Sequence, residues 1–103
     1  MKIPSDDSLK GLQEYIYQTN IERKFTKDVS KKLVLLMEEV GELAKAVRKN
    51  VGLKFSETTE VAELKEELAD VQRVLLGLAS LLDIDMFDAV IEKETENLKR
   101  NWS

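Results

Sequence analysis

The sequence has no cysteine, no histidine, one proline and four glycines among its 103 residues. Without cysteine there is no disulfide framework and no thiolate chemistry. Without histidine, the chain lacks the imidazole of common zinc hydrolase sites, of Glu-x-x-His di-iron bundles, and of Ser-His or Cys-His nucleophile pairs. Any chemistry therefore rests on carboxylates, lysine, arginine, asparagine or hydroxyl groups. Ligands made only of oxygen suit hard cations such as Mg²⁺, Mn²⁺ or Ca²⁺.

Long apolar runs, a leader-like N-terminus and an excess of basic residues are also absent. No apolar run approaches the roughly 20 residues that span a bilayer, and the first residues lack the apolar core of a signal peptide. The net charge is −4, whereas binding to DNA or RNA normally needs a basic face. The sequence therefore predicts a cytoplasmic protein whose partners include no membrane and no nucleic-acid polymer.

What is present is the composition of a helical protein, dominated by Leu, Glu, Lys, Ala and Val. Strong helix formers with few breakers predict an all-α fold, and the length predicts a single domain over residues 1–103. Ser5 and Asp85 are expected to cap the first and last helices. The predicted helices cover about residues 5–23, 28–50, 59–82 and 85–102, with a loop over 51–57.

The third predicted helix is unusually apolar in its second half. Eight of the twelve residues from Val71 to Leu82 are Val, Leu or Ala. An apolar stripe this broad is buried on more than one side. The sequence therefore predicts a four-helix bundle-like protomer that is completed by oligomerisation, as a homodimer or homotetramer.

Paired carboxylates mark the second and third predicted helices. Glu39 and Glu42 are three residues apart, as are Glu67 and Asp70, and residues at this spacing project along neighbouring lines of a helix. Both pairs lie along apolar flanks, and two antiparallel helices would bring them together. Four inward-facing charges repel one another unless a cation neutralises them. The pattern therefore indicates a divalent-metal site able to hold phosphate oxygens and polarise a water.

Glutamate is also common on exposed helix faces, so spacing alone leaves a second interpretation open, in which these acids are solvated and pair with nearby lysines. A basic face on the fourth predicted helix has the same ambiguity. Lys93, Asn97 and Arg100 fall at positions i, i+4 and i+7, and such side chains suit phosphate binding. The alternative is a solvated basic flank near a helix C-terminus, which the helix dipole favours.

At these residues the chain resembles the MazG-like nucleotide pyrophosphohydrolases, a branch of the all-α NTP pyrophosphatase superfamily. The similarity covers about residues 8 to 102. The strings that carry it are Glu38-Glu39-Val40-Gly41-Glu42, Glu67-Leu68-Ala69-Asp70 and Lys93-x-x-x-Asn97-x-x-Arg100.

The resemblance implies Mg²⁺-dependent hydrolysis of a small nucleotide, from (d)NTP and water to (d)NMP and pyrophosphate, which would clear surplus or aberrant nucleotides. Mn²⁺ is the expected substitute metal. Many relatives carry a Trp near the end of the first helix that stacks on the base, and here we expect Phe25 to take that role. The implied metal ligands are Glu39, Glu42, Glu67 and Asp70; Glu38 is a further ligand or orients the attacking water; Lys93, Asn97 and Arg100 hold phosphates.

Two alternatives remain. Phosphoribosyl-ATP pyrophosphohydrolase belongs to the same superfamily, but its acidic helix usually has Gly before Glu-Glu, unlike Glu38-Glu39-Val40-Gly41-Glu42 here. A non-catalytic helical assembly module would use the acids only as solubilising charge. Metal-dependent nucleotide binding separates an enzyme from such a module.

Overall fold

The chain forms four helices over residues 3–50 and 58–100, which are the residues that the computed structural model describes. They are α1 (Leu9–Glu22), α2 (Val29–Asn50), α3 (Thr58–Leu81) and α4 (Met86–Leu98), and these ranges contain no strand. The predicted all-α class and the order of four helices are confirmed. The loop predicted over 51–57 lies outside the described residues. α4 ends at Leu98, before the predicted end at Trp102.

The first cap differs from the predicted one. Ser8, not Ser5, precedes α1 in an extended conformation, and its Oγ accepts a hydrogen bond from Gly11 N at 2.9 Å. Asp6 Oδ1 accepts from Ser8 N at 3.2 Å, which holds this segment outside the helix. Asp85 caps α4 as predicted and accepts from Asp88 N at 2.8 Å. Each cap satisfies one of the N–H groups that a helix start leaves without a partner.

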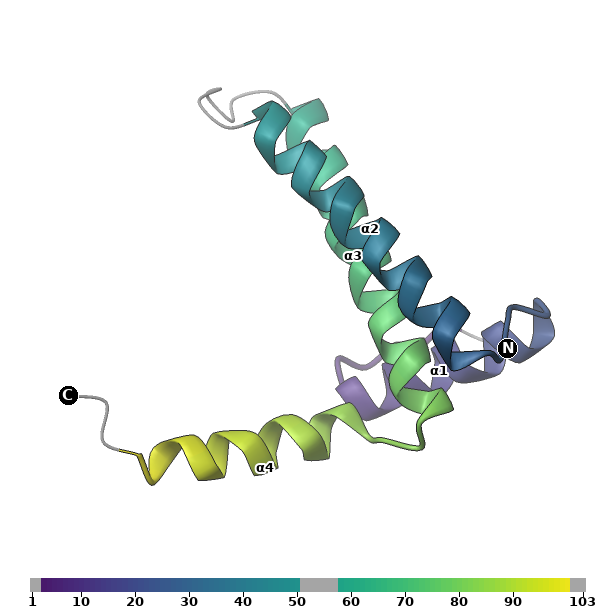
Figure 1. Cartoon of the computed structure of the whole chain (residues 1–103), viewed down its shortest axis with the longest axis vertical. Helices are drawn as coiled ribbons and strands as arrows, with labels where there is room; N and C mark the ends of the chain where they lie inside the picture. The colour runs from purple at the N-terminus through teal and green to yellow at the C-terminus, as the bar shows by residue number, and fades with distance from the viewer. Residues whose placement is uncertain (1–2, 51–57, 101–103) are drawn as a thin grey trace.

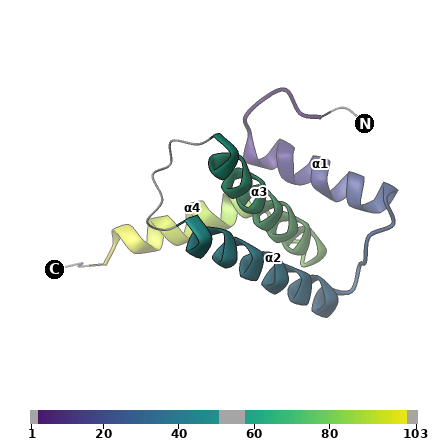
Figure 2. The ribbon, with the colours of Figure 1, turned by 90° about the horizontal axis from the view of Figure 1, so that it is seen from above.

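α2 and α3 run side by side in opposite directions, and α3 lies between α1 and α2 (Figures 1 and 2). The apolar second half of α3 supplies most of the core, with Leu76 only 1 % exposed. The buried apolar residues are Ile16, Ala46, Val74, Leu76, Leu78 and Ala79. Because α1 and α2 cover two sides of this segment, its broad apolar stripe is explained within one chain. No helix in the described part of the chain is long and apolar enough to cross a membrane.

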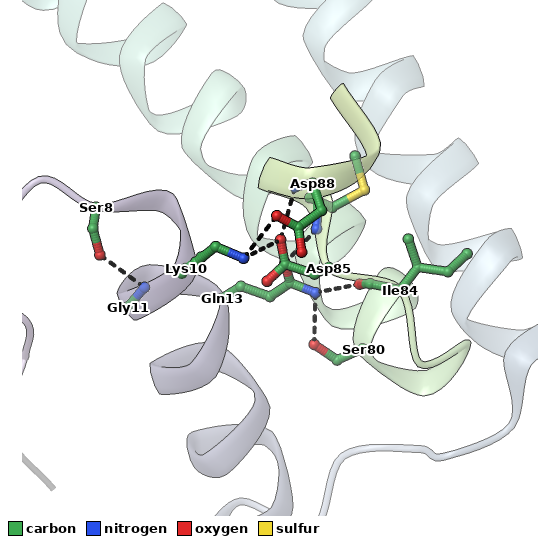
Figure 3. Close-up of polar contacts among 9 residues, drawn as sticks. Ser8, Lys10, Gly11, Gln13, Ser80, Ile84, Asp85 and Asp88 are labelled. Atoms are coloured by element: carbon green, nitrogen blue, oxygen red, sulfur yellow. Dashed lines mark hydrogen bonds and ion pairs between the residues drawn. The ribbon is translucent and has the colours of Figure 1, made fainter. Parts of the chain in front are cut away.

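A buried glutamine joins α1 to the turn between α3 and α4 (Figure 3). Gln13 is 6 % exposed. Its Nε2 donates to Ser80 Oγ at 3.1 Å and to the carbonyl oxygen of Ile84 at 2.8 Å. Its Oε1 accepts from Met86 N at 2.9 Å. All the polar atoms of this side chain therefore have partners, as a buried amide requires.

An ion pair strengthens the same junction. Lys10 Nζ lies 3.1 Å from Asp85 and 2.9 Å from Asp88 at the start of α4 (Figure 3). Beyond this anchor, α4 diverges from the α2–α3 pair (Figure 1). The packed part of a single chain therefore consists of α1, α2 and α3. α4 does not complete the predicted bundle within one chain, because the junction holds its first turn on α1 and directs its axis away.

Candidate metal centre

Three of the four predicted acidic ligands meet between α2 and α3. Glu39 comes from α2, and Glu67 and Asp70 come from α3; each offers a carboxylate oxygen, and these oxygens all lie within 4.8 Å of one another. The antiparallel pairing of the two helices creates this arrangement, since it sets Glu39 beside two acids that are one helical turn apart. The sequence pattern predicted this convergence correctly for these three residues.

The three carboxylates are poorly compensated by the protein. Glu39 and Glu67 are half-buried, while Asp70 is exposed. Oε2 of Glu67 is buried and has no hydrogen-bond partner among the residues that the structure describes. Burial raises the pKa of Glu67, and the negative charges of Asp70, Glu39, Glu42 and Glu63 raise it further. A hard divalent cation fits this donor set, because it would give the buried oxygen a partner and neutralise the mutual repulsion.

Two further predicted acids lie on α2 but outside this group. Glu42 is 57 % exposed, and its carboxylate is 3.9 Å from Lys45 Nζ. A long, exposed ion pair of this kind holds the Glu42 side chain only loosely. Glu42 is also near enough to Glu67 for its charge to raise the pKa of Glu67. Glu38 is exposed. Their assignments as ligand and water-orienting group stay predictions.

The predicted phosphate-binding residues lie on α4. Lys93 and Arg100 are exposed, and Asn97 is half-buried. Figure 1 shows that the second half of α4 lies apart from the middle of the α2–α3 pair, where the three acids meet. One chain therefore does not bring the basic face beside the acids, and its role in phosphate binding stays a prediction.

Phe25, the predicted base-stacking residue, already has cationic neighbours. Its ring centroid is 5.7 Å from Lys32 Nζ and 5.6 Å from Arg73 Cζ, both within range of a cation–π contact. The ring remains 42 % exposed. In this structure the Phe25 ring makes cation–π contacts with two side chains, and its stacking on a base stays a prediction.

The sequence-based interpretation missed Lys32 and Arg73. Lys32 is 2 % exposed, although it follows Lys31 in a stretch typical of a solvated helix start. Burial lowers the pKa of the Lys32 ammonium, and the nearby charge of Arg73 lowers it further. A spacing signal was available, since Lys32 is seven residues before Glu39 and Arg73 is three residues after Asp70. Both therefore lie on the helix faces that carry the acids.

The sequence that builds this geometry is similar to known proteins. Residues 27–100 match the MazG nucleotide pyrophosphohydrolase domain. The matched span contains Glu39, Glu67 and Asp70 as well as all of α2, α3 and α4. An uncharacterised protein of Bacillus subtilis (strain 168), YpjD, is 39% identical over 72 residues, which cover 66% of this chain and 65% of that protein. The match thus spans just under two thirds of this relative's length.

Proposed function

Because the chain belongs to the MazG nucleotide pyrophosphohydrolase family, we propose that it hydrolyses (d)NTPs to (d)NMPs and pyrophosphate with Mg²⁺ as its metal. The observation that supports this most strongly is the group of three carboxylates within 4.8 Å, one of which has a buried oxygen without a partner. Such a group favours a bound cation over a purely structural role, because without a cation the charges repel and the buried oxygen has no compensation.

In this proposal Glu39, Glu67 and Asp70 would hold the ion, and Glu42 would leave its loose contact with Lys45 to join them. The bound metal would neutralise phosphate oxygens and polarise a water. Glu38, next to Glu39 on α2, would orient the attacking water and accept its proton as the water oxygen attacks the α-phosphorus. The bond breaks between the α-phosphorus and the oxygen that joins it to the β-phosphorus, and this oxygen leaves as part of pyrophosphate.

The test is an analysis of products across the common NTPs and dNTPs. We expect equal amounts of monophosphate and pyrophosphate in the presence of Mg²⁺, activity also with Mn²⁺, and none after chelation. Chromatography identifies the products. Diphosphate and orthophosphate as the only products would contradict attack at the α-phosphorus.

Oligomerisation is part of the same proposal. The outer side of α2 carries apolar residues at helical spacing, namely Leu33, Met37, Val40 and Val47, each 39–56 % exposed. On α4, Val90, Ile91 and Leu98 are 49–78 % exposed. Exposed apolar side chains gathered on a helix in this way are typical of a contact site, and a second copy is the occupant that we propose.

We therefore expect light scattering at micromolar concentration to give the mass of a dimer or tetramer. Burial of the apolar stripe on α2 is the physical reason, so replacing Met37 with Glu should lower the mass towards that of one chain. Tyr17→Glu is the matched control, because Tyr17 is also partly exposed but lies on α1, and it should leave the mass unchanged. A stable and active monomer of the parent protein would contradict the proposal.

A further inference from the structure

A cavity lies beside α1, at the α1 end of the α2–α3 pair, and is separate from the acidic group. Its volume is about 80 Å³. Tyr17, Asn20, Phe25, Lys27, Lys32 and Gly77 contribute to its lining. No Cβ fills the space at Gly77, where it would come within 2.8 Å of Asn20 Nδ2 and 3.1 Å of Lys32 Cε. The glycine therefore lets these two polar side chains approach α3.

The charge in and around this cavity is positive and has little compensation. Lys32 is 2 % exposed, and no carboxylate among the described residues forms an ion pair with it. Arg73, beside it, donates to Thr19 Oγ1 at 3.4 Å and is attracted by the charge of Asp70 without forming an ion pair. The charge of Arg23 lies close enough to disfavour that of Arg73. Together with Lys27 of the cavity lining, four cationic side chains thus gather here in a chain whose net charge is −4.

The ammonium group of a lysine as buried as Lys32 normally has an anionic partner, because removing its charge from water is unfavourable. The ring of Phe25 supplies only part of that compensation. The volume of the cavity limits what else the partner can be. About 80 Å³ exceeds the roughly 15 Å³ that one water needs. It is far below the roughly 300–1,000 Å³ of pockets that enclose drug-sized ligands, so a compact anion fits and a whole nucleotide does not.

We propose that this cavity binds one phosphate group, with Lys32 as its principal cation and Lys27 and Arg73 adding positive potential. Thr26 is a further donor: its Oγ1 accepts a hydrogen bond from Asp28 N at 3.1 Å, so its hydroxyl proton can point to an anion. Lysine and arginine are the usual phosphate-binding side chains. Lys32 is seven positions before Glu39, which places the cavity about 10 Å along α2 from the acidic group.

The test is a titration of the full chain with inorganic phosphate in metal-free buffer at constant ionic strength. Calorimetry measures the binding, and the melting temperature is recorded at each phosphate concentration. We expect saturable binding and a saturable rise in melting temperature. Lys32→Met should weaken binding by about tenfold or more, the loss expected for one charge-assisted hydrogen bond. It should also melt above the parent in phosphate-free buffer, because an uncompensated buried charge is gone.

Lys31→Met is the matched control, since it makes the same change at the neighbouring exposed lysine. It should bind phosphate like the parent, and it corrects for the general stabilisation that phosphate gives to folded proteins. Absence of saturable binding to the parent would overturn the proposal whether or not the variants fold. Equal binding by Lys32→Met and Lys31→Met would also overturn it. A fall in oligomer mass for Lys32→Met, with no phosphate effect on the parent, would assign the missing anion to a second copy instead.

Two sources of the phosphate group are distinguishable. If it belongs to the substrate, inorganic phosphate should compete with the nucleotide, and Lys32→Met should raise KM more than it lowers kcat. If it belongs to a separate effector, phosphate should bind without competition and KM should stay unchanged. Because the titration uses neither metal nor nucleotide, its outcome does not depend on the proposed hydrolysis.

Discussion

Replacing Asp70 with Asn, or Glu67 with Gln, is expected to lower turnover by several orders of magnitude. Each change keeps the shape of the side chain but replaces an anionic oxygen ligand with a neutral amide. Hard cations prefer charged oxygen ligands, and both residues belong to the group whose oxygens lie within 4.8 Å. Initial rates of pyrophosphate release at saturating Mg²⁺ measure the effect.

The same variants should fold as well as the parent, or better, in metal-free buffer. The pKa of Glu67 is raised in the folded chain by burial first and by the neighbouring acids next. At pH values between the unfolded and the folded pKa of Glu67, the folded state therefore binds more protons than the unfolded state. The free energy of unfolding of the parent should therefore fall as pH rises through this range. Glu67→Gln lacks this titration, so thermal melts from acid to neutral pH should show a flatter profile.

Glu63→Gln is the matched control on α3, one helical turn before Glu67. Glu63 pairs with Lys49 at 3.6 Å and lies outside the group of three. Exposed pairs of this kind contribute about 0–1 kcal/mol, so activity should stay near that of the parent. Glu42→Gln tests whether Glu42 joins the site, and we expect a large loss there too. Full activity in Asp70→Asn or in Glu42→Gln would contradict the assignment of these acids.

The helices were predictable because their signals are local. Breakers and caps set both ends of α2 and the start of α4 close to where the structure has them, and Asp85 is the cap that its position indicated. The end of α4 was placed too late, at Trp102 instead of Leu98. The start of α1 was predicted wrongly, at Ser5 instead of Ser8, because serine is a good cap at either position and residue type alone does not choose between them. The hydrogen bond from Ser8 N to Asp6, which favours the later start, depends on the local chain path. A propensity scale does not contain that information.

The acidic group was predictable because one assumption, antiparallel packing of two neighbouring helices, brings Glu39 to Glu67 and Asp70. Burial of Lys32 depends instead on where α1 crosses α3, which helical periodicity alone does not determine. The path of α4 also follows from tertiary contacts, namely those of Gln13 and Lys10 with the α3–α4 turn and the start of α4. The positions of Lys93 and Arg100 relative to the acids were therefore beyond the sequence pattern.

Nucleotide binding should depend almost completely on a divalent metal. Without a cation, the three carboxylates present negative charge to a triphosphate that is itself strongly negative, so repulsion opposes binding. With Mg²⁺, the same oxygens hold an ion that also binds phosphate oxygens. Asp70→Asn removes a charged ligand of that ion, so its affinity for nucleotide in Mg²⁺ should fall strongly. Glu63→Gln should bind nucleotide like the parent.

The measurement that tests the metal site most directly is isothermal titration of the parent chain with a non-hydrolysable nucleoside triphosphate analogue, with and without Mg²⁺. We predict saturable heat of binding with Mg²⁺, none in chelated buffer, and a strongly reduced signal for Asp70→Asn with Mg²⁺. Nucleotide binding that is equal with and without the metal, or absent in both, would contradict a metal-dependent nucleotide site at Glu39, Glu67 and Asp70.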